Sequence, residues 1–150
     1  MKRAHLSVLS LIGAAAMTLA TPALAQGDVI QGDVAEGEKD FRKCRSCHTI
    51  ASEDEVFVKG GRTGPNLYGV VGRAAGAGSF KYSKSMIEAG EAGLIWTPEA
   101  IVAYVADPTG YLKEVTGDGK ARSKMTFKLK DATDVAAYLA SLAPLPAATE

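Results

Sequence analysis

Three residues with the chemistry to bind a redox cofactor lie within the first third of the chain: Cys44, Cys47 and His48, in the order Cys-Arg-Ser-Cys-His. The C-x-x-C-H spacing is typical of c-type haem attachment. Two thiols separated by two residues can add to the two vinyl groups of one haem from a single turn of chain. The histidine that follows then lies against the ring, where its imidazole can bind the iron. The motif predicts one covalent haem c, attached through Cys44 and Cys47 and ligated by His48.

The N-terminal 25 residues have the pattern of an export signal. An apolar stretch follows Lys2 and Arg3, and Ala23-Leu24-Ala25 has the small-x-small form of a signal-peptidase site. The apolar stretch is shorter than the roughly 20 residues of a stable membrane span, so we favour a cleaved signal over an uncleaved anchor. No later stretch is apolar for long enough to cross a membrane. The expected organisation is a signal at 1–25 and a mature periplasmic domain at 26–150, with a core at about 32–142 and a tail at 143–150.

Removal of the signal changes both the charge and the histidine count. The whole chain has 17 basic and 17 acidic side chains. Lys2 and Arg3 leave with the signal and no acidic residue does, so the mature chain has 15 basic and 17 acidic side chains, a formal net charge of −2. This balance does not indicate a general nucleic-acid binder. His5 also leaves, so His48 is the one histidine of the mature chain.

Other chemistries also use paired cysteines. A zinc site takes four ligands, whereas the mature chain offers two cysteines and one histidine. A thioredoxin-like redox pair is expected beside a βαβ pattern, which this sequence lacks. A short structural disulfide fits an exported chain, and the spacing alone does not exclude it. The disulfide would leave the long loops of this chain without a core, so we favour haem.

The second axial ligand of the iron decides the function of a haem protein. An open position binds small ligands, whereas a strong second ligand leaves only electron transfer. A second histidine is excluded by counting, and a methionine thioether is the next candidate. Met86 lies beside Ile87 in a helical stretch, where methionine usually fills the core. Met125 lies in a polar segment and follows His48 by 77 residues, which leaves enough chain to wrap around the haem.

The elements that must position these residues are predominantly helical. Asp33 and Glu36 resemble a capping box, and Ser83, Thr97-Pro98 and Asp131 are further start signals. Strand signals are weak, and two candidate segments are too short to build a sheet: Val56-Phe57-Val58 and Val70-Val71. The predicted fold class is all-α with long loops, which require a large apolar cofactor to pack against. The expected helices span about 33–44, 83–90, 97–107, a short piece around 111–112, and 131–142.

The chain resembles class I cytochromes c, most closely the cytochrome c2 and cytochrome c-550 group of purple and related bacteria. The resemblance covers about Gly32 to Leu142 and rests on the order of its motifs. The stretches between His48 and Pro65 and between Tyr111 and Met125 are longer than in mitochondrial cytochromes c, which leaves the docking surface open. The matching motifs are Gly37-x-x-x-Phe41-x-x-Cys44-x-x-Cys47-His48, Thr63-Gly64-Pro65-Asn66-Leu67-Tyr68-Gly69, Gly72-Arg73, Phe80-Lys81-Tyr82, Trp96-Thr97, Tyr104, Pro108, Tyr111-Leu112, Lys124-Met125-Thr126-Phe127 and Val135-Ala136-Ala137-Tyr138-Leu139.

The resemblance implies a role for several of these residues. It implies that Met125 is the axial sulfur ligand and that the Pro65 carbonyl accepts a hydrogen bond from the ring N–H of His48. Tyr104 is expected near the Met125 sulfur. Three further side chains are implied as hydrogen-bond donors around the buried haem propionates: Arg73, Tyr82 and Trp96. Where the first and last helices cross, two residue pairs are implied in contact, namely Gly37 and Phe41 on one side and Val135 and Tyr138 on the other.

These assignments imply a monomeric one-electron carrier and no enzyme. The family implies the cytochrome bc1 complex as donor and a photosynthetic reaction centre or cytochrome c oxidase as acceptor. An acceptor for a periplasmic dehydrogenase has the same chemistry and stays open. A haem sensor or peroxidatic enzyme is disfavoured, since the mature chain has no distal histidine. Docking is expected through lysines near the haem edge: Lys43, Lys59, Lys84, Lys124, Lys128 and Lys130.

Overall fold

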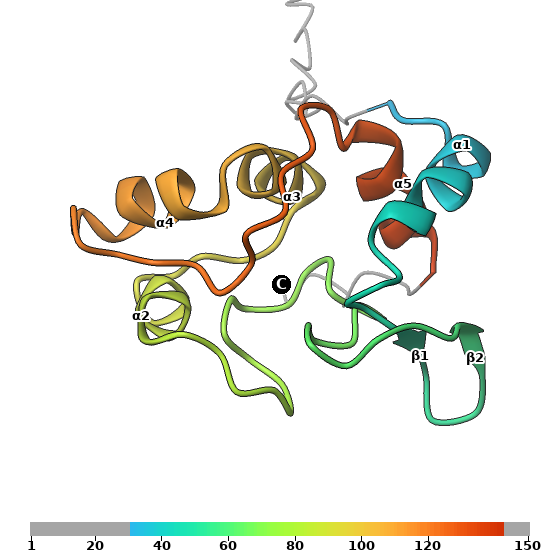
Figure 1. Cartoon of the computed structure of the whole chain (residues 1–150), viewed down its shortest axis with the longest axis horizontal. Coiled ribbons are helices and arrows are strands. Elements are labelled where there is room, and N and C mark those ends of the chain that lie inside the picture. The colour runs from blue at the N-terminus through green and yellow to red at the C-terminus, as the bar shows by residue number, and fades with distance from the viewer. Residues whose placement is uncertain (1–30, 143–150) are drawn as a thin grey trace, which may run out of the picture.

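The computed structural model describes residues 31–142, so the predicted signal and the tail lie outside the described residues. Within this range no helix is both long and apolar enough to cross a membrane. Figure 1 shows helices on several sides of the molecule and a small hairpin at one corner. In chain order the elements are α1 (Val34–Asp40), the 3-10 helix η1 (Phe41–Lys43), β1 (Ile50–Ala51), β2 (Val56–Val58), α2 (Lys84–Glu91), α3 (Pro98–Ala106), α4 (Pro108–Thr116) and α5 (Thr133–Ser141). The predicted all-α class is confirmed.

Polar side chains start the first three α-helices at the predicted residues. Asp33 Oδ1 accepts hydrogen bonds from the backbone N–H groups of Ala35 at 2.8 Å and Glu36 at 3.0 Å. Ser83 and Thr97 cap α2 and α3 in the same way, through the third residue of each helix. These side chains satisfy backbone donors that have no partner inside the helix. The helix starts predicted at these three residues are confirmed.

The later helices differ from the prediction in their limits. The short piece expected around 111–112 is a nine-residue helix, α4, which Asp107 caps and Gly117 ends in the left-handed conformation at φ 66°. Asp131 was expected to cap α5, but Ala132 occupies the N-cap position without a side-chain cap. Asp131 instead lies one position before the N-cap and accepts a hydrogen bond at 2.9 Å from the backbone N–H of Thr133, the first residue of α5.

A two-stranded sheet corrects the expectation for residues 56–58. β2 pairs antiparallel with β1, with Ile50 opposite Val58 and Ala51 opposite Val56. The side chain of Thr49, which precedes β1, adds a hydrogen bond between the strands, because its Oγ1 donates to the Val58 carbonyl at 2.7 Å. Two short strands can therefore pair where a side chain adds a cross-strand bond. Val70 and Val71 are buried but form no strand.

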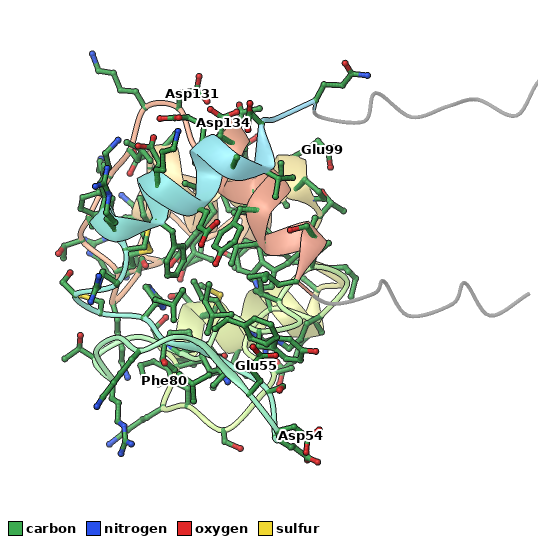
Figure 2. All side chains as sticks on the ribbon, turned by 90° about the vertical axis from the view of Figure 1, so that its right-hand side faces the viewer. Asp54, Glu55, Phe80, Glu99, Asp131 and Asp134 are labelled. Atoms are coloured by element: carbon green, nitrogen blue, oxygen red, sulfur yellow. The ribbon has the colours of Figure 1, made fainter. Side chains whose placement is uncertain are left out.

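The first and last helices cross at a glycine. A Cβ atom at Gly37 would collide with the backbone carbonyl of Asp134 on α5 and would lie 2.9 Å from Tyr138 Cβ. The Phe41 ring meets the Tyr138 ring edge to face, with centroids 5.9 Å apart. Asp134, labelled in Figure 2 where the two helices meet, accepts a hydrogen bond from Asp33 N at 2.8 Å. The expected contacts of Gly37 and Phe41 with Tyr138 are confirmed. The packing of α1 against α5 therefore fixes the segment that leads into the cysteine motif.

Candidate functional site

The cysteine motif forms one tight turn directly after η1. The backbone N–H groups of Cys47 and His48 both donate to the Cys44 carbonyl, at 3.1 and 3.0 Å. The turn is anchored at its start, because Cys44 N donates to the carbonyl of the buried Phe41 at 2.8 Å. The helix crossing that fixes Phe41 thereby fixes the position of the cysteines. Both cysteines are free thiols that line one cavity, with Cys44 half-buried and Cys47 exposed.

The two thiols have opposite electrostatic environments. Burial, with a smaller contribution from the Asp40 carboxylate, raises the pKa of Cys44 to about 11. Hydrogen bonds from Thr63 and Ser46 lower the pKa of Cys47. Because the thiolate is the reactive form of cysteine, a larger fraction of Cys47 than of Cys44 is in the reactive form at neutral pH.

The imidazole of His48 is held in one orientation and one tautomer. Its Nδ1 lies 2.8 Å from the Pro65 carbonyl oxygen. A carbonyl can only accept, so Nδ1 carries the proton and Nε2 keeps a free lone pair. Burial lowers the pKa of His48, and the bond to Pro65 partly opposes this effect. The neutral ring that results is the form that binds metal ions.

A glycine-rich strap at residues 60–64 holds the motif from the other side. Gly61 N donates to the Arg45 carbonyl and Gly64 N donates to the Cys47 carbonyl, both at 2.9 Å. A Cβ atom at Gly64 would collide with the His48 ring, since it would lie 2.7 Å from Nδ1. Cβ atoms at Gly60 and Gly61 would collide with backbone carbonyls of the motif. The strap can approach this closely because these three residues lack side chains.

All nine predicted site residues line one cavity of about 370 Å³. This volume lies within the range of ligand and cofactor sites. Most of the remaining lining is apolar, including Phe41, Leu67, Val70, Ile101 and Leu139. The structure thus gathers residues that are up to 81 positions apart in the sequence. The nine are Cys44, Cys47, His48, Pro65, Arg73, Tyr82, Trp96, Tyr104 and Met125.

Met125 reaches the cavity from the loop between α4 and α5, and a serine connects it to Tyr104. The Ser123 hydroxyl lies 2.7 Å from Tyr104 Oη and accepts a hydrogen bond from Met125 N at 3.0 Å. Burial raises the pKa of Tyr104, and the bond to Ser123 partly opposes this effect. Sequence reasoning placed Tyr104 near Met125 but missed Ser123. The segment around Met125 is polar throughout, so its sequence does not show that the Ser123 hydroxyl points into the molecule.

Met86 also lines the cavity and is 7% exposed. It lies in α2, with its backbone N–H bonded to the Ser83 cap. The cavity therefore contains two thioethers, one on a helix and one on a loop.

The three polar or aromatic side chains expected around carboxylates have defined partners. Arg73 Nη2 donates to the Asn66 carbonyl at 3.0 Å, which leaves its other N–H groups available. The Tyr82 hydroxyl donates to the Ala77 carbonyl at 2.9 Å. Trp96 is 8% exposed and packs edge to face on Tyr104, with ring centroids 5.0 Å apart. Arg73, Tyr82 and Trp96 therefore add a positive charge and polar groups to a cavity whose lining is mostly apolar.

The donor set of this site fits a haem and fits poorly to a protein-ligated zinc. Within residues 31–142 no three His, Cys, Asp or Glu side chains come close enough together to hold a metal ion. The cavity instead offers a neutral imidazole, a thioether and two thiols against apolar walls. Haem iron takes imidazole and thioether as axial ligands, and the thiols match its two vinyl groups.

Comparison with known proteins gives the family. No family model matches the chain. Cytochrome c-551 of Roseobacter denitrificans is 52% identical over 130 residues, which cover 85% of this chain and 90% of the relative. Cytochrome c2 of Rhodobacter capsulatus is 53% identical over 131 residues, which cover 85% and 91%. The chain belongs to the cytochrome c2 and c-550 family.

Solved structures of this family have the same fold. Cytochrome c2 of Paracoccus denitrificans matches with a TM-score of 0.74 at 45% identity, over 76% of this chain and 98% of that structure. Cytochrome c2 of Rhodobacter capsulatus matches with a TM-score of 0.71 at 54% identity, over 73% and 97%. Like other cytochromes of this family, the chain carries one covalent c-type haem and is an electron carrier. The expected family, fold and cofactor are confirmed.

Proposed function

We propose that the chain is a His/Met-ligated electron carrier, with Cys44 and Cys47 bound covalently to the haem and with His48 and Met125 as axial ligands. The observation that supports this most is the 2.8 Å bond between His48 Nδ1 and the Pro65 carbonyl. It leaves the lone pair of Nε2 unused inside a cavity that Met125 also lines. A carbonyl that accepts a hydrogen bond from the other ring nitrogen fixes the tautomer of a metal-ligating histidine and makes it a better ligand.

The residues of the chain then control one-electron transfer. The haem supplies an iron that alternates between the ferrous and ferric states. The Met125 thioether favours the ferrous state and raises the reduction potential. His48 keeps its ring orientation through Pro65, and Met125 keeps its backbone position through Ser123. Neither ligand has to leave, so the site needs no substrate at the iron and supports no enzymatic activity.

Arg73, Tyr82 and Trp96 are proposed to face the two haem carboxylates. A buried carboxylate needs hydrogen-bond donors or a positive charge. Arg73 has unused N–H groups for this role. The Tyr82 hydroxyl has one proton, and it donates this proton to the Ala77 carbonyl at 2.9 Å. Arg73 therefore offers more free donors for a propionate than Tyr82 does.

Five of the six lysines expected near the haem edge divide into two groups, and the sixth, Lys124, bonds to backbone carbonyls. Lys43, Lys84 and Lys128 form ion pairs with Asp40, Glu88 and Asp107, at 2.8, 3.1 and 2.8 Å. Lys59 and Lys130 are exposed and form no ion pair within residues 31–142. An unpaired ammonium attracts an acidic partner more strongly than one whose charge is already offset. We therefore propose Lys59 and Lys130 as the stronger docking charges.

Three acidic side chains are neighbours in the hairpin loop that precedes β2. Glu53, Asp54 and Glu55 are exposed on the loop between β1 and β2, and Figure 2 shows Asp54 at an outer tip of the molecule. A near-neutral protein with separated charges is a dipole, which orients it as it approaches a charged partner. The proposed setting is the periplasm, with the cytochrome bc1 complex as donor. A photosynthetic reaction centre or a terminal cytochrome c oxidase would be the acceptor. The alternative donor is a periplasmic dehydrogenase, from which the chain would accept electrons.

Substitution of Met125 tests the proposal. Met125→Leu keeps the volume and removes the sulfur, so the reduction potential should fall by more than about 100 mV, a fraction of the ~0.8 V range that axial ligands span. Met86→Leu is the matched control, because it removes the other thioether of the cavity, and it should leave the potential nearly unchanged. A reduced parent protein that binds carbon monoxide readily at neutral pH would contradict a closed iron. A potential that moves with Met86→Leu instead would assign the ligand to α2.

A further inference from the structure

The segment that carries Met125 is held by side chains rather than by backbone pairing. Backbone hydrogen bonds flank it, from Ala121 N to the Asp118 carbonyl at 2.9 Å and from Leu129 N to the Val105 carbonyl at 3.1 Å. Between them, no backbone group of residues 122–128 bonds to another backbone group in the described part of the chain. Whatever keeps the thioether in the cavity must therefore come from side chains.

Two hydroxyl groups hold the first half of this segment. Arg122 N donates to Ser85 Oγ on α2 at 3.1 Å, and Ser123 N donates to Thr109 Oγ1 on α4 at 3.3 Å. Both bonds lie on the N-terminal side of Met125. They fix where the segment leaves α4, but neither reaches the residues beside the thioether on the outer rim of the cavity.

Lys124 makes a different connection. Its Nζ donates to the Lys81 carbonyl and to the Tyr82 carbonyl, the latter at 3.1 Å. The partners are backbone oxygens 43 and 42 residues away, on the loop that precedes α2. Lys124 and Tyr82 both line the cavity. The ammonium therefore joins two separate segments of the cavity wall at its rim.

The other paired lysines of this face bond differently. Lys43 and Lys84 pair with carboxylates three and four residues away on their own helical segment. Lys128 pairs with the exposed carboxylate of Asp107. Exposed pairs of this kind contribute little to stability. Lys124 instead satisfies two carbonyl groups of a loop, which no other described lysine side chain does.

We propose that Lys124 is a positioning residue that latches the Met125 segment to residues 81–82 and so keeps the thioether at the haem. This inference rests on the proposed ligation by Met125. It also separates Lys124 from the docking lysines, because two of its three N–H groups are already committed inside the molecule. Without these two hydrogen bonds, the Met125 segment would move away from the haem more often. The coordination position proposed for Met125 would then be accessible to other ligands.

Competition by imidazole measures this opening in the ferric haem-loaded protein. Imidazole replaces a methionine ligand only when the methionine has left, so its apparent affinity reports the open fraction. Lys124→Ala should raise this affinity about tenfold, which corresponds to about 1.4 kcal/mol. Lys124→Arg keeps a donor that can reach the carbonyls and should restore most of the parent value. Lys130→Ala removes the same charge from a neighbouring, unpaired lysine and should leave the affinity for imidazole unchanged, although it is expected to slow docking.

Hydrogen exchange gives a readout that does not depend on the haem ligand. The three hydrogen-bonded amide groups of the segment, those of Arg122, Ser123 and Met125, should exchange faster in Lys124→Ala, while those of α1 and α5 stay as in the parent protein. The proposal is overturned if imidazole affinity and exchange are both unchanged. It is also overturned if Lys124→Ala merely slows association with an acidic partner by as much as Lys130→Ala does, since Lys124 would then be a docking charge. Met125→Leu separates the two proposals: an unchanged potential in that variant contradicts the ligation itself, whatever Lys124 does.

Discussion

Pro65 and His48 are joined by a hydrogen bond of 2.8 Å from the ring Nδ1 to the backbone carbonyl. The two residues are 17 positions apart in the sequence. Gly64, which precedes Pro65, lies directly against the same ring. The carbonyl belongs to the backbone, so it could come from any residue type. What the sequence must supply is the absence of a side chain at Gly64 and a stiff backbone at Pro65.

Gly64→Ala should therefore be more harmful than its size suggests. The added Cβ collides with the imidazole, and over-packing of this kind costs about 1–3 kcal/mol. We expect a lower denaturation midpoint in urea and a lower yield of haem-loaded protein. Gly119→Ala is the matched control, because a Cβ atom there would meet nothing within 4 Å. Equal stability of the two variants would contradict the role of Gly64 in seating the ring.

Gly37→Ala tests the helix crossing. The new methyl group would collide with the Asp134 carbonyl, which belongs to the backbone of α5 and cannot swing away. The helices would have to separate, at a cost of about 1–3 kcal/mol. Chemical denaturation followed by far-UV circular dichroism measures the loss. At an exposed position inside a helix, Gly→Ala raises the free energy of unfolding by up to about 1 kcal/mol. The sign of the change in Gly37→Ala therefore distinguishes a close helix crossing from an exposed position.

The bond between Ser123 and Tyr104 should have a measurable coupling energy. Ser123→Ala leaves the Tyr104 hydroxyl buried without its partner, which costs about 1–3 kcal/mol. Tyr104→Phe removes the other half of the pair. The double variant should be more stable than the sum of the single losses indicates, and the difference in a double-mutant cycle is expected to be about 1 kcal/mol. Strict additivity would show that the 2.7 Å contact contributes nothing.

The burial of Tyr104 predicts a loss of stability in alkali. Folding raises the pKa of this phenol above its ordinary value of 10.0, so the native state retains a proton that the unfolded chain releases. The stabilising contribution is complete below pH ~10 and decreases as the pH rises through the folded pKa. The free energy of unfolding, measured from pH 8 to 11, should fall less steeply for Tyr104→Phe than for the parent. Parallel curves would mean that Tyr104 titrates as in the unfolded chain.

Unpaired lysines should matter more to docking than paired ones. Lys59→Ala and Lys130→Ala are each expected to slow association with purified quinol–cytochrome c oxidoreductase about threefold at low ionic strength, with a smaller effect at physiological salt. Lys84→Ala removes the same charge from a lysine paired with Glu88 and should slow association less. Stopped-flow mixing measures these rates. A larger effect from Lys84 would show that the ion pair does not offset its charge.

The parts of the site that could be predicted from the sequence are those encoded by neighbouring residues. The cysteine motif and the caps Asp33, Ser83 and Thr97 depend on short spacings, and these short-range patterns predicted the covalent haem and three helix starts. The family pattern added the distant residues that line the cavity. Gly60 and Ser123 could not be assigned in this way, because their importance depends on which distant segment passes within contact distance.

The hairpin and the last helix show a second limit. Two- and three-residue strands have too little pattern to predict alone, and the pairing of β1 with β2 is reinforced by the hydroxyl of Thr49. Asp131 has the residue type of a cap but lies one position too early. Residue type predicts that a turn begins, whereas the backbone geometry decides which amide the carboxylate reaches.

Trp96 gives the protein a built-in optical reporter. It is the single tryptophan of the chain, and it lines the same cavity as the haem ligands. We expect its emission to be quenched in the folded, haem-loaded protein by energy transfer to the porphyrin, and to appear when the chain expands and the indole moves away. Unfolding of every variant described above can therefore be followed by intrinsic fluorescence, without a label that would disturb the crowded wall in which Trp96 packs on Tyr104.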